Sequence, residues 1–241
     1  MMSCNTISED ERLIYVKQPD AKRTVLIEDF TGQKCINCPN AADKIAQLKK
    51  DYGHNIIAVG IHSGPLAVYS RGKILGLRTA EGDEYYNHWN IQEEPTGYIN
   101  RTGEISTIDK WDKLVREAIE QTTPVTMNIY GEVNVETREI HFFVWTLTNK
   151  TIDAKLQLWV TESGITAQQA MPDGSNNPDY VHNHVFRTSI NGTWGTDLKL
   201  QEYQDVTQEF TFQVPQEWVM NNLSIVAFIY DETGVLQACE M

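Results

Sequence analysis

The spacing of apolar residues changes at Pro124, and this change constrains the fold more than any other feature of the chain. Before it, short apolar runs rich in β-branched residues alternate with segments whose apolar residues recur at helical spacing, as in an α/β unit. From Val125 onward, apolar and polar residues alternate one by one, as in a strand with one buried face. Further short strands without a strong helix between them are typical of a β-sandwich. We therefore predict an α/β domain over 21–122, followed by an all-β, immunoglobulin-like sandwich over 124–241.

The predicted elements follow each other in a regular order. In the α/β part we expect strands over 24–30, 55–61, 96–101 and 104–107, and helices over 36–50, 80–89 and 109–121. After the strand that starts at Val125, we expect strands over 139–147, 155–161, 183–190, 208–214 and 223–230. The span 163–180 is rich in Gly, Pro, Asn and Asp, which predicts a long loop.

Acidic side chains outnumber basic ones, with 33 Asp and Glu against 20 Lys and Arg, so the formal net charge is −13. A strongly anionic protein is not attracted to nucleic acid or to anionic membranes, and neither is an expected partner. Apolar residues make up 41% of the chain, which is enough for a packed core. No apolar run reaches the ~18 residues that a membrane-spanning helix needs.

A cysteine close to the start of the chain, Cys4, follows the small residue Ser3. This arrangement resembles the end of a bacterial lipoprotein signal, in which the cysteine is lipidated after cleavage. On this interpretation residues 1–20 are a tether with an acidic run, and a lipid at Cys4 holds the protein on a membrane. The alternative is an ordinary N-terminus with an incidental thiol.

The strongest chemical signal is the pair Cys35 and Cys38, which lies between a predicted strand and a predicted helix. A cysteine at a helix N-terminus meets free backbone N–H groups and the positive end of the helix dipole, and both favour the reactive thiolate. Lys34 adds a positive charge nearby. The two-residue spacer lets one thiol resolve a mixed disulfide formed by the other, so the motif indicates thiol–disulfide exchange.

Two further residues fit this chemistry. Asp29 lies near the end of the preceding strand, where a buried carboxyl with a raised pKa could carry a proton to the second thiol. Its neighbour Glu28 faces the opposite side of the strand, so the assignment depends on register. Pro95 opens a later strand, and a cis peptide bond there would bring backbone hydrogen-bonding groups beside the cysteines.

In order and spacing, these residues resemble the thioredoxin superfamily over about residues 21–122. The resemblance implies Cys35 as attacking thiol, Cys38 as resolving thiol, Asp29 as proton shuttle and Pro95 as cis-proline. The chain departs from the usual pattern at Lys34, where the superfamily usually has a tryptophan, and in its Ile-Asn spacer.

A second resemblance covers nearly the whole chain. The runs Glu28–Pro39, Pro95–Arg101, His182–Val185 with Arg187, and Val226–Ala238 are similar to the outer-membrane-protein-28-related family of Gram-negative envelope lipoproteins. This family resemblance implies a lipidated N-terminus, a thioredoxin-like domain, a C-terminal β-domain and a place in the cell envelope, at the outer membrane.

The residues themselves leave simpler interpretations open. Cys35 and Cys38 can form a fixed structural disulfide or half of a zinc site, although no second pair of ligands at a suitable spacing follows. His182 and His184 are expected on one face of a strand, as hydrogen-bonded structural histidines or as metal ligands. We expect Cys239 to be a buried free thiol.

The leading functional hypothesis is an envelope-anchored exchange protein that acts on a protein thiol or disulfide and needs no cofactor and no metal. It predicts that Cys35 is partly exposed and Cys38 is shielded. The alternative is a non-enzymatic surface or binding lipoprotein that uses the loops at 163–180 and 191–204. It predicts that residues 35–38 are covered, by the 62–90 insertion or by the β-domain.

Overall fold

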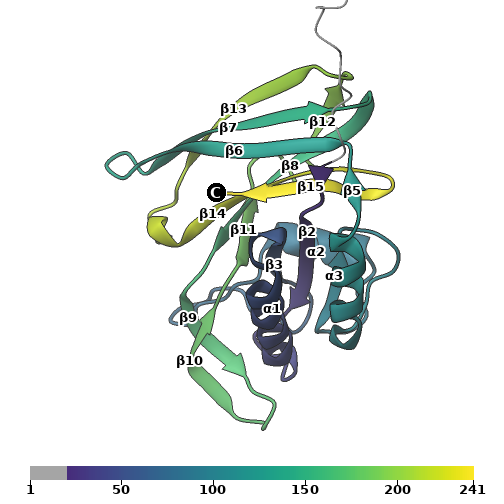
Figure 1. The fold of residues 1–241 in the computed structure, drawn as a ribbon. Coiled ribbons are helices and arrows are strands. Elements are labelled where there is room, and N and C mark those ends of the chain that lie inside the picture. The colour runs from purple at the N-terminus through teal and green to yellow at the C-terminus, as the bar shows by residue number, and fades with distance from the viewer. Residues whose placement is uncertain (1–20) are drawn as a thin grey trace, which may run out of the picture.

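The computed structural model describes residues 21–241 as a mixed α/β fold that is mostly sheet, with three α-helices in this range (Figure 1). The helices are α1 (Cys38–Tyr52), α2 (Ala80–His88) and α3 (Trp111–Ile119), and the single-turn 3₁₀ helices are η2 (Gly53–Asn55), η3 (Ile108–Lys110) and η4 (Met220–Asn222). The strands are β1 (Ala21–Lys22), β2 (Val25–Thr31), β3 (Ile56–His62), β4 (Thr96–Ile99), β5 (Thr122–Thr123), β6 (Val125–Asn134), β7 (Glu139–Thr148), β8 (Ile152–Glu162), β9 (Ile165–Ala170), β10 (Asn176–His182), β11 (Val185–Ser189), β12 (Thr196–Leu200), β13 (Asp205–Gln213), β14 (Leu223–Asp231) and β15 (Gly234–Glu240). No helix within residues 21–241 is long and apolar enough to cross a membrane.

One large sheet runs through the molecule in the order β15-β14-β8-β11-β3-β2-β4, and β12 pairs with the other end of β8. Strands β2 and β3 are parallel, whereas β4 is antiparallel to β2. The sheet continues across the predicted boundary because β11 pairs with β3, and the Gly60 amide donates to the His184 carbonyl at 2.8 Å. That residues 21–122 and 124–241 are separate domains stays a prediction.

The two faces of β2 are buried against different cores. All seven residues of β2 are buried, as expected for an apolar strand in the middle of a sheet. Val25 and Ile27 pack on one face with the buried sides of α1 and α3, including Trp111. Leu26 and Phe30 pack on the other face. There they share a core with α2 and with strands of the second half of the chain; its largest members are Tyr85, Trp159, Phe186 and Phe228.

A three-stranded antiparallel sheet, β13-β7-β6, covers the far part of the large sheet (Figure 1). Residues alternate in and out along β7, and the inward side chains Ile140, Phe142 and Val144 pack against Leu156 and Leu158 of β8. This alternation is what the sequence pattern after Pro124 indicates. The second half of the chain therefore contains two sheets packed face to face.

Most of the predicted strands and helices are present, but the long loop predicted for 163–180 is wrong. That segment forms most of an antiparallel hairpin, β9–β10, which projects past the end of α1 (Figure 1). Its turn-forming residues lie at the tip and in the first part of β10, where the register shifts between Asn177 and Tyr180. Ile165, Ala167 and Gln169 are buried at alternate positions of β9. The predicted strand over 104–107 is reduced to a bridge between Gly97 and Ser106.

Candidate functional site

Cys35 and Cys38 form a disulfide at the N-terminus of α1, with their Cα atoms 5.4 Å apart. Cys38 is the first residue of the helix, and Pro39 follows at a position where its missing N–H has no helical partner to lose. Both cysteines are only 3% exposed. The expectation of a partly exposed Cys35 is therefore wrong for this oxidised state.

Two segments distant in sequence cover the disulfide loop. From β9, the Gln169 amide group donates to the Cys35 carbonyl at 2.8 Å and to the Gly32 carbonyl at 3.3 Å. From the insertion after β3, the Leu66 carbonyl accepts the Lys34 amide at 2.8 Å. Sequence reasoning missed Gln169, because a glutamine in a segment rich in turn formers carries no motif. The covering of residues 35–38 is what the scaffold hypothesis predicts.

Gln33 joins the two covering segments to the disulfide loop. Its side-chain amide donates to the Leu75 carbonyl at 3.0 Å and to the Gln168 carbonyl at 3.3 Å, and its oxygen accepts the Leu77 amide at 2.9 Å. The side chain is buried and is bonded to backbone groups of both segments. Sequence reasoning missed this residue too.

The register of β2 places Asp29 on the face that carries α1. It lies opposite Gly60 of β3 and Gly97 of β4, and it is 4% exposed. Its Oδ1 atom has no hydrogen-bond partner. Burial, reinforced by the nearby carboxyl of Glu94, raises the pKa of Asp29 to about 8, so this group is largely protonated at neutral pH.

A second carboxyl, Glu94, lies next to the disulfide. The Glu94–Pro95 peptide bond is cis, the geometry that the sequence predicted. A carboxylate oxygen of Glu94 lies within 4.8 Å of the sulfur atoms of Cys35 and Cys38. Both of its oxygens are shielded from solvent and lack hydrogen-bond partners, and burial raises its pKa to about 7. Sequence reasoning missed Glu94, although its position directly before Pro95 was a usable signal.

Cys35, Cys38 and Glu94 also form a group of three metal-ligand types among the described residues. Metals bind the thiolate form of cysteine, and neither sulfur offers a thiolate while the disulfide is intact. The oxidised arrangement is therefore suited to disulfide chemistry rather than to holding an ion.

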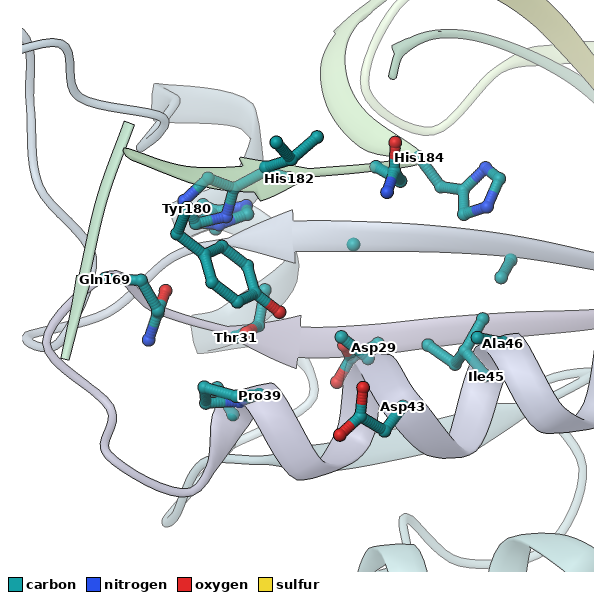
Figure 2. A pocket seen from close by; sticks show the side chains of 17 residues that line it. Asp29, Thr31, Pro39, Asp43, Ile45, Ala46, Gln169, Tyr180, His182 and His184 are labelled. Carbon is teal, nitrogen blue, oxygen red and sulfur yellow. The ribbon is translucent and has the colours of Figure 1, made fainter. Parts of the chain in front are cut away.

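A cavity of ≈ 370 Å³ reaches the site from the side of α1, β3 and β10 (Figure 2). Cys38 lines it and Cys35 does not. Its polar lining includes Asp29, Asp43, Gln169, Tyr180 and three histidines, His62, His182 and His184. In Figure 2, Tyr180 extends from β10 toward Asp29 and Asp43.

The histidines of the cavity are uncharged at neutral pH. The rings of His62 and His182 are 5.2 Å apart. Burial lowers the pKa of His62 to about 3, with a smaller effect from His182, and it lowers the pKa of His182 and of His184 to about 4. The expectation that His182 and His184 share one face of a strand is wrong, since β10 ends at His182 and His184 has a φ of 55° in the turn before β11.

The remaining candidate residues lie away from the disulfide. Cys239 is a half-buried free thiol whose pKa burial raises to about 12, so it is a weak nucleophile. Trp194 packs edge-on against Tyr85 at 5.1 Å. Cys4, the candidate lipidation site, lies outside the described residues.

The profile of outer membrane protein Omp28 matches residues 82–240, about two thirds of the chain. The chain belongs to the Omp28 family. Family membership locates the protein in the cell envelope, at the outer membrane. No curated protein sequence matches this chain.

The comparison with solved structures gives matches at low sequence identity. HBP35 of Porphyromonas gingivalis is similar with a TM-score of 0.73 and 15% identity, over 93% of this chain and 76% of that one. Protein AGR_C_4864 from Agrobacterium tumefaciens matches with a TM-score of 0.50 and 14% identity, over 92% of this chain and 96% of that one. A domain of the outer membrane lipoprotein Omp28 from Porphyromonas gingivalis matches 49% of this chain and 94% of its own, with 22% identity and a TM-score of 0.34.

Proposed function

We propose that this Omp28-family protein carries out thiol–disulfide exchange at Cys35–Cys38, within a thioredoxin-like unit held at the outer membrane by a lipid on Cys4. The order β2, α1, β3 and β4, with the disulfide at the start of α1, supports the thioredoxin-like assignment. The two packed sheets after Pro124 support an immunoglobulin-like sandwich as the second unit.

The observation that carries the proposal is the pair of unpartnered carboxyls beside the disulfide. Asp29 Oδ1 and both oxygens of Glu94 are shielded from water and have no hydrogen-bond partner. Burial of polar groups without partners opposes folding. A disulfide with a purely structural role gains nothing from such carboxyls beside it. Strongly shifted pKa values near a reactive group are typical of functional sites.

These carboxyls can supply the proton that exchange requires. When a substrate thiolate attacks one sulfur of the pair, a new S–S bond forms, the Cys35–Cys38 bond breaks and the other sulfur leaves as a thiolate. A neutral carboxylic acid with a pKa of about 7 or 8 can protonate that thiolate at neutral pH. A carboxylate oxygen of Glu94 lies within 4.8 Å of the sulfurs and has no hydrogen-bond partner, so the proton crosses by one water molecule or after a side-chain rotation.

One observation favours a second candidate function, a binding lipoprotein that uses the fold as a scaffold. Both cysteines are buried, and Gln169 holds the hairpin over them. A disulfide closed off in this way resists exchange with large substrates. In that case the β9–β10 hairpin, which projects from the body, is the surface that meets a partner.

The two functions differ in the rate at which the disulfide is transferred. We would mix the oxidised protein, with Cys4 and Cys239 replaced by Ser, with a peptide dithiol and follow peptide oxidation. Exchange activity predicts transfer faster than from glutathione disulfide at equal concentration, and none from the matched Cys35→Ser/Cys38→Ser variant. Transfer no faster than from glutathione disulfide would favour the scaffold.

A further inference from the structure

The cavity beside α1 gives a small molecule a route to one sulfur of the disulfide. It reaches Cys38 but not Cys35, whose backbone is held under Gln169 of β9. A volume of ≈ 370 Å³ is at the low end of pockets that take small ligands, and it is too small for a folded protein segment. The sulfur open to a cavity-bound reagent is therefore that of Cys38.

Three residues that line the cavity carry polar groups that lack partners. Asp29 Oδ1, His62 Nδ1 and His182 Nε2 are buried atoms of lining residues, and none has a hydrogen-bond partner. All three residues are more than nine-tenths buried. A buried polar group without a partner has lost its hydrogen bonds to water and gained none in return. A ligand that forms hydrogen bonds with these atoms restores them, and this contributes to its affinity.

The charge of the lining selects among small thiols. The described lining residues include the carboxyl groups of Asp29 and Asp43 and no Lys or Arg. An anionic ligand would meet no counter-charge among these lining side chains, because Lys49 and Arg187, which act on His184 and His62, lie outside the lining. It would also meet a chain with a net charge of −13. An ammonium group can pair with the Asp43 carboxylate and with the hydroxyl of Tyr180, which extends toward it (Figure 2).

We infer that the cavity binds a small aminothiol, which attacks Sγ of Cys38 as the electron donor for the disulfide. The inference rests on the proposed exchange function and names its small substrate. The thiolate sulfur bonds to Cys38, the Cys35–Cys38 bond breaks, and Cys35 leaves with the electron pair and takes a proton from Glu94. A second aminothiol then attacks the sulfur of the first, which releases a small disulfide and leaves Cys38 reduced. Overall, two thiols are oxidised to one disulfide and the protein disulfide is reduced to two thiols.

A matched panel of thiols tests the charge requirement on the full protein with Cys4 and Cys239 replaced by Ser. Cysteamine, 2-mercaptoethanol and mercaptoethanesulfonate are of similar size and carry a positive, no and a negative charge beside the thiol. Rates of reduction, expressed per thiolate, should fall in that order, with about tenfold or more between the first and the last, as expected for one charge pair near a protein surface. Equal rates, or a faster anionic thiol, would overturn the inference.

Two variants test the route. Ala42→Phe places a ring at an exposed helix position that lines the cavity, and Gln47→Phe places the same ring at an exposed position of α1 outside it. We expect Ala42→Phe to slow cysteamine at least tenfold and Gln47→Phe to leave the rate unchanged. If Ala42→Phe is reduced at the wild-type rate, the route is not through this cavity.

The attacked sulfur is identified with single-cysteine variants in the same background. Reaction with cystamine should label Cys38 in Cys35→Ser at least tenfold faster than Cys35 in Cys38→Ser. Faster labelling of Cys35, with normal reduction of the wild-type pair, would overturn the inference and leave the exchange function intact. A wild-type disulfide that no thiol in the panel reduces, dithiothreitol included, would instead count against the exchange function itself.

Discussion

Glu28 and Asp29 are adjacent in β2 and both are buried, yet their surroundings differ in kind. Glu28 faces the aromatic core and accepts two hydrogen bonds from the Arg101 guanidinium, at 2.7 and 2.9 Å. Asp29 faces the cavity and α1, with no cation beside it and with one oxygen unpartnered. One strand therefore carries a charged, paired carboxyl on one face and a neutral carboxyl on the other.

The two carboxyls therefore differ in role. Glu28 stabilises the fold through its ion pair, whereas we propose that Asp29 takes part in the exchange chemistry. The Arg101 guanidinium also lies over the rings of Tyr230 and Phe228, at 4.7 and 4.9 Å, so the ion pair joins β2 to the far half of the sheet. Asp29 is buried without a cationic partner of this kind and retains its proton, and it lines the cavity that reaches Cys38, the site of the proposed exchange.

The largest effect on stability should come from breaking the ion pair between Glu28 and Arg101. Arg101→Met leaves the Glu28 carboxylate buried without a partner, and we expect a loss of about 3–5 kcal/mol in the free energy of unfolding. Denaturant unfolding at pH 7 measures it. The double variant Glu28→Met/Arg101→Met removes both charges and should recover most of the loss; a double variant as unstable as the single one would contradict the account of the pair.

Asp29→Asn should instead raise the free energy of unfolding. Because its pKa is raised above the ordinary value, folded Asp29 holds a proton that the unfolded chain has lost, so its presence destabilises the fold increasingly from about pH 4 to about pH 8. The variant should be more stable than wild type at pH 9 by a few kcal/mol, at about 1.4 kcal/mol per pKa unit. The gain should vanish at pH 4. Unfolding curves at both pH values check this, and a gain that did not depend on pH would contradict it.

The histidines should make the fold sensitive to acid. Burial lowers the pKa of His182 to about 4 in the folded protein. Below pH 6.5 the unfolded chain therefore binds a proton at this residue, whereas the folded protein binds one only below about pH 4. Stability should therefore fall between these pH values, and His182→Gln should remove part of the fall, on the order of 1–3 kcal/mol. The exposed His54 is a matched control, and His54→Gln should leave the pH profile unchanged. Equal profiles for the two variants would show that His182 is not the group responsible.

Glu94→Gln should have a specific effect on the rate of exchange. The amide keeps the shape of the side chain but has no proton to donate, so exchange at pH 6 should slow by about tenfold or more. The loss should shrink above pH 8, where the wild-type carboxyl, with its pKa of about 7, has itself lost the proton. Stopped-flow reduction at several pH values measures this. A loss of rate independent of pH would indicate a role in packing alone.

The sequence predicted the parts of the site that lie close together along the chain. The disulfide, its position at a helix start, Asp29 and the cis Glu94–Pro95 bond follow from local pattern and from the thioredoxin resemblance. A cover over the disulfide was expected only under the scaffold hypothesis, and the residues that form it did not follow from the sequence, because they meet through hydrogen bonds such as Gln169 to Cys35, whose partners are 134 residues apart. A hairpin that consists largely of polar residues also has weak periodicity, which is why 163–180 looked like a loop.

The most direct test of the central claim is the reduction potential of the Cys35–Cys38 pair. We would equilibrate the full protein, with Cys4 and Cys239 replaced by Ser, in thiol buffers of graded potential and count free thiols by alkylation and mass spectrometry. The account predicts a reversible two-electron transition within roughly −120 to −270 mV, the range of known exchange proteins. A pair that stays oxidised below about −300 mV would contradict it and would identify the bond as a structural disulfide.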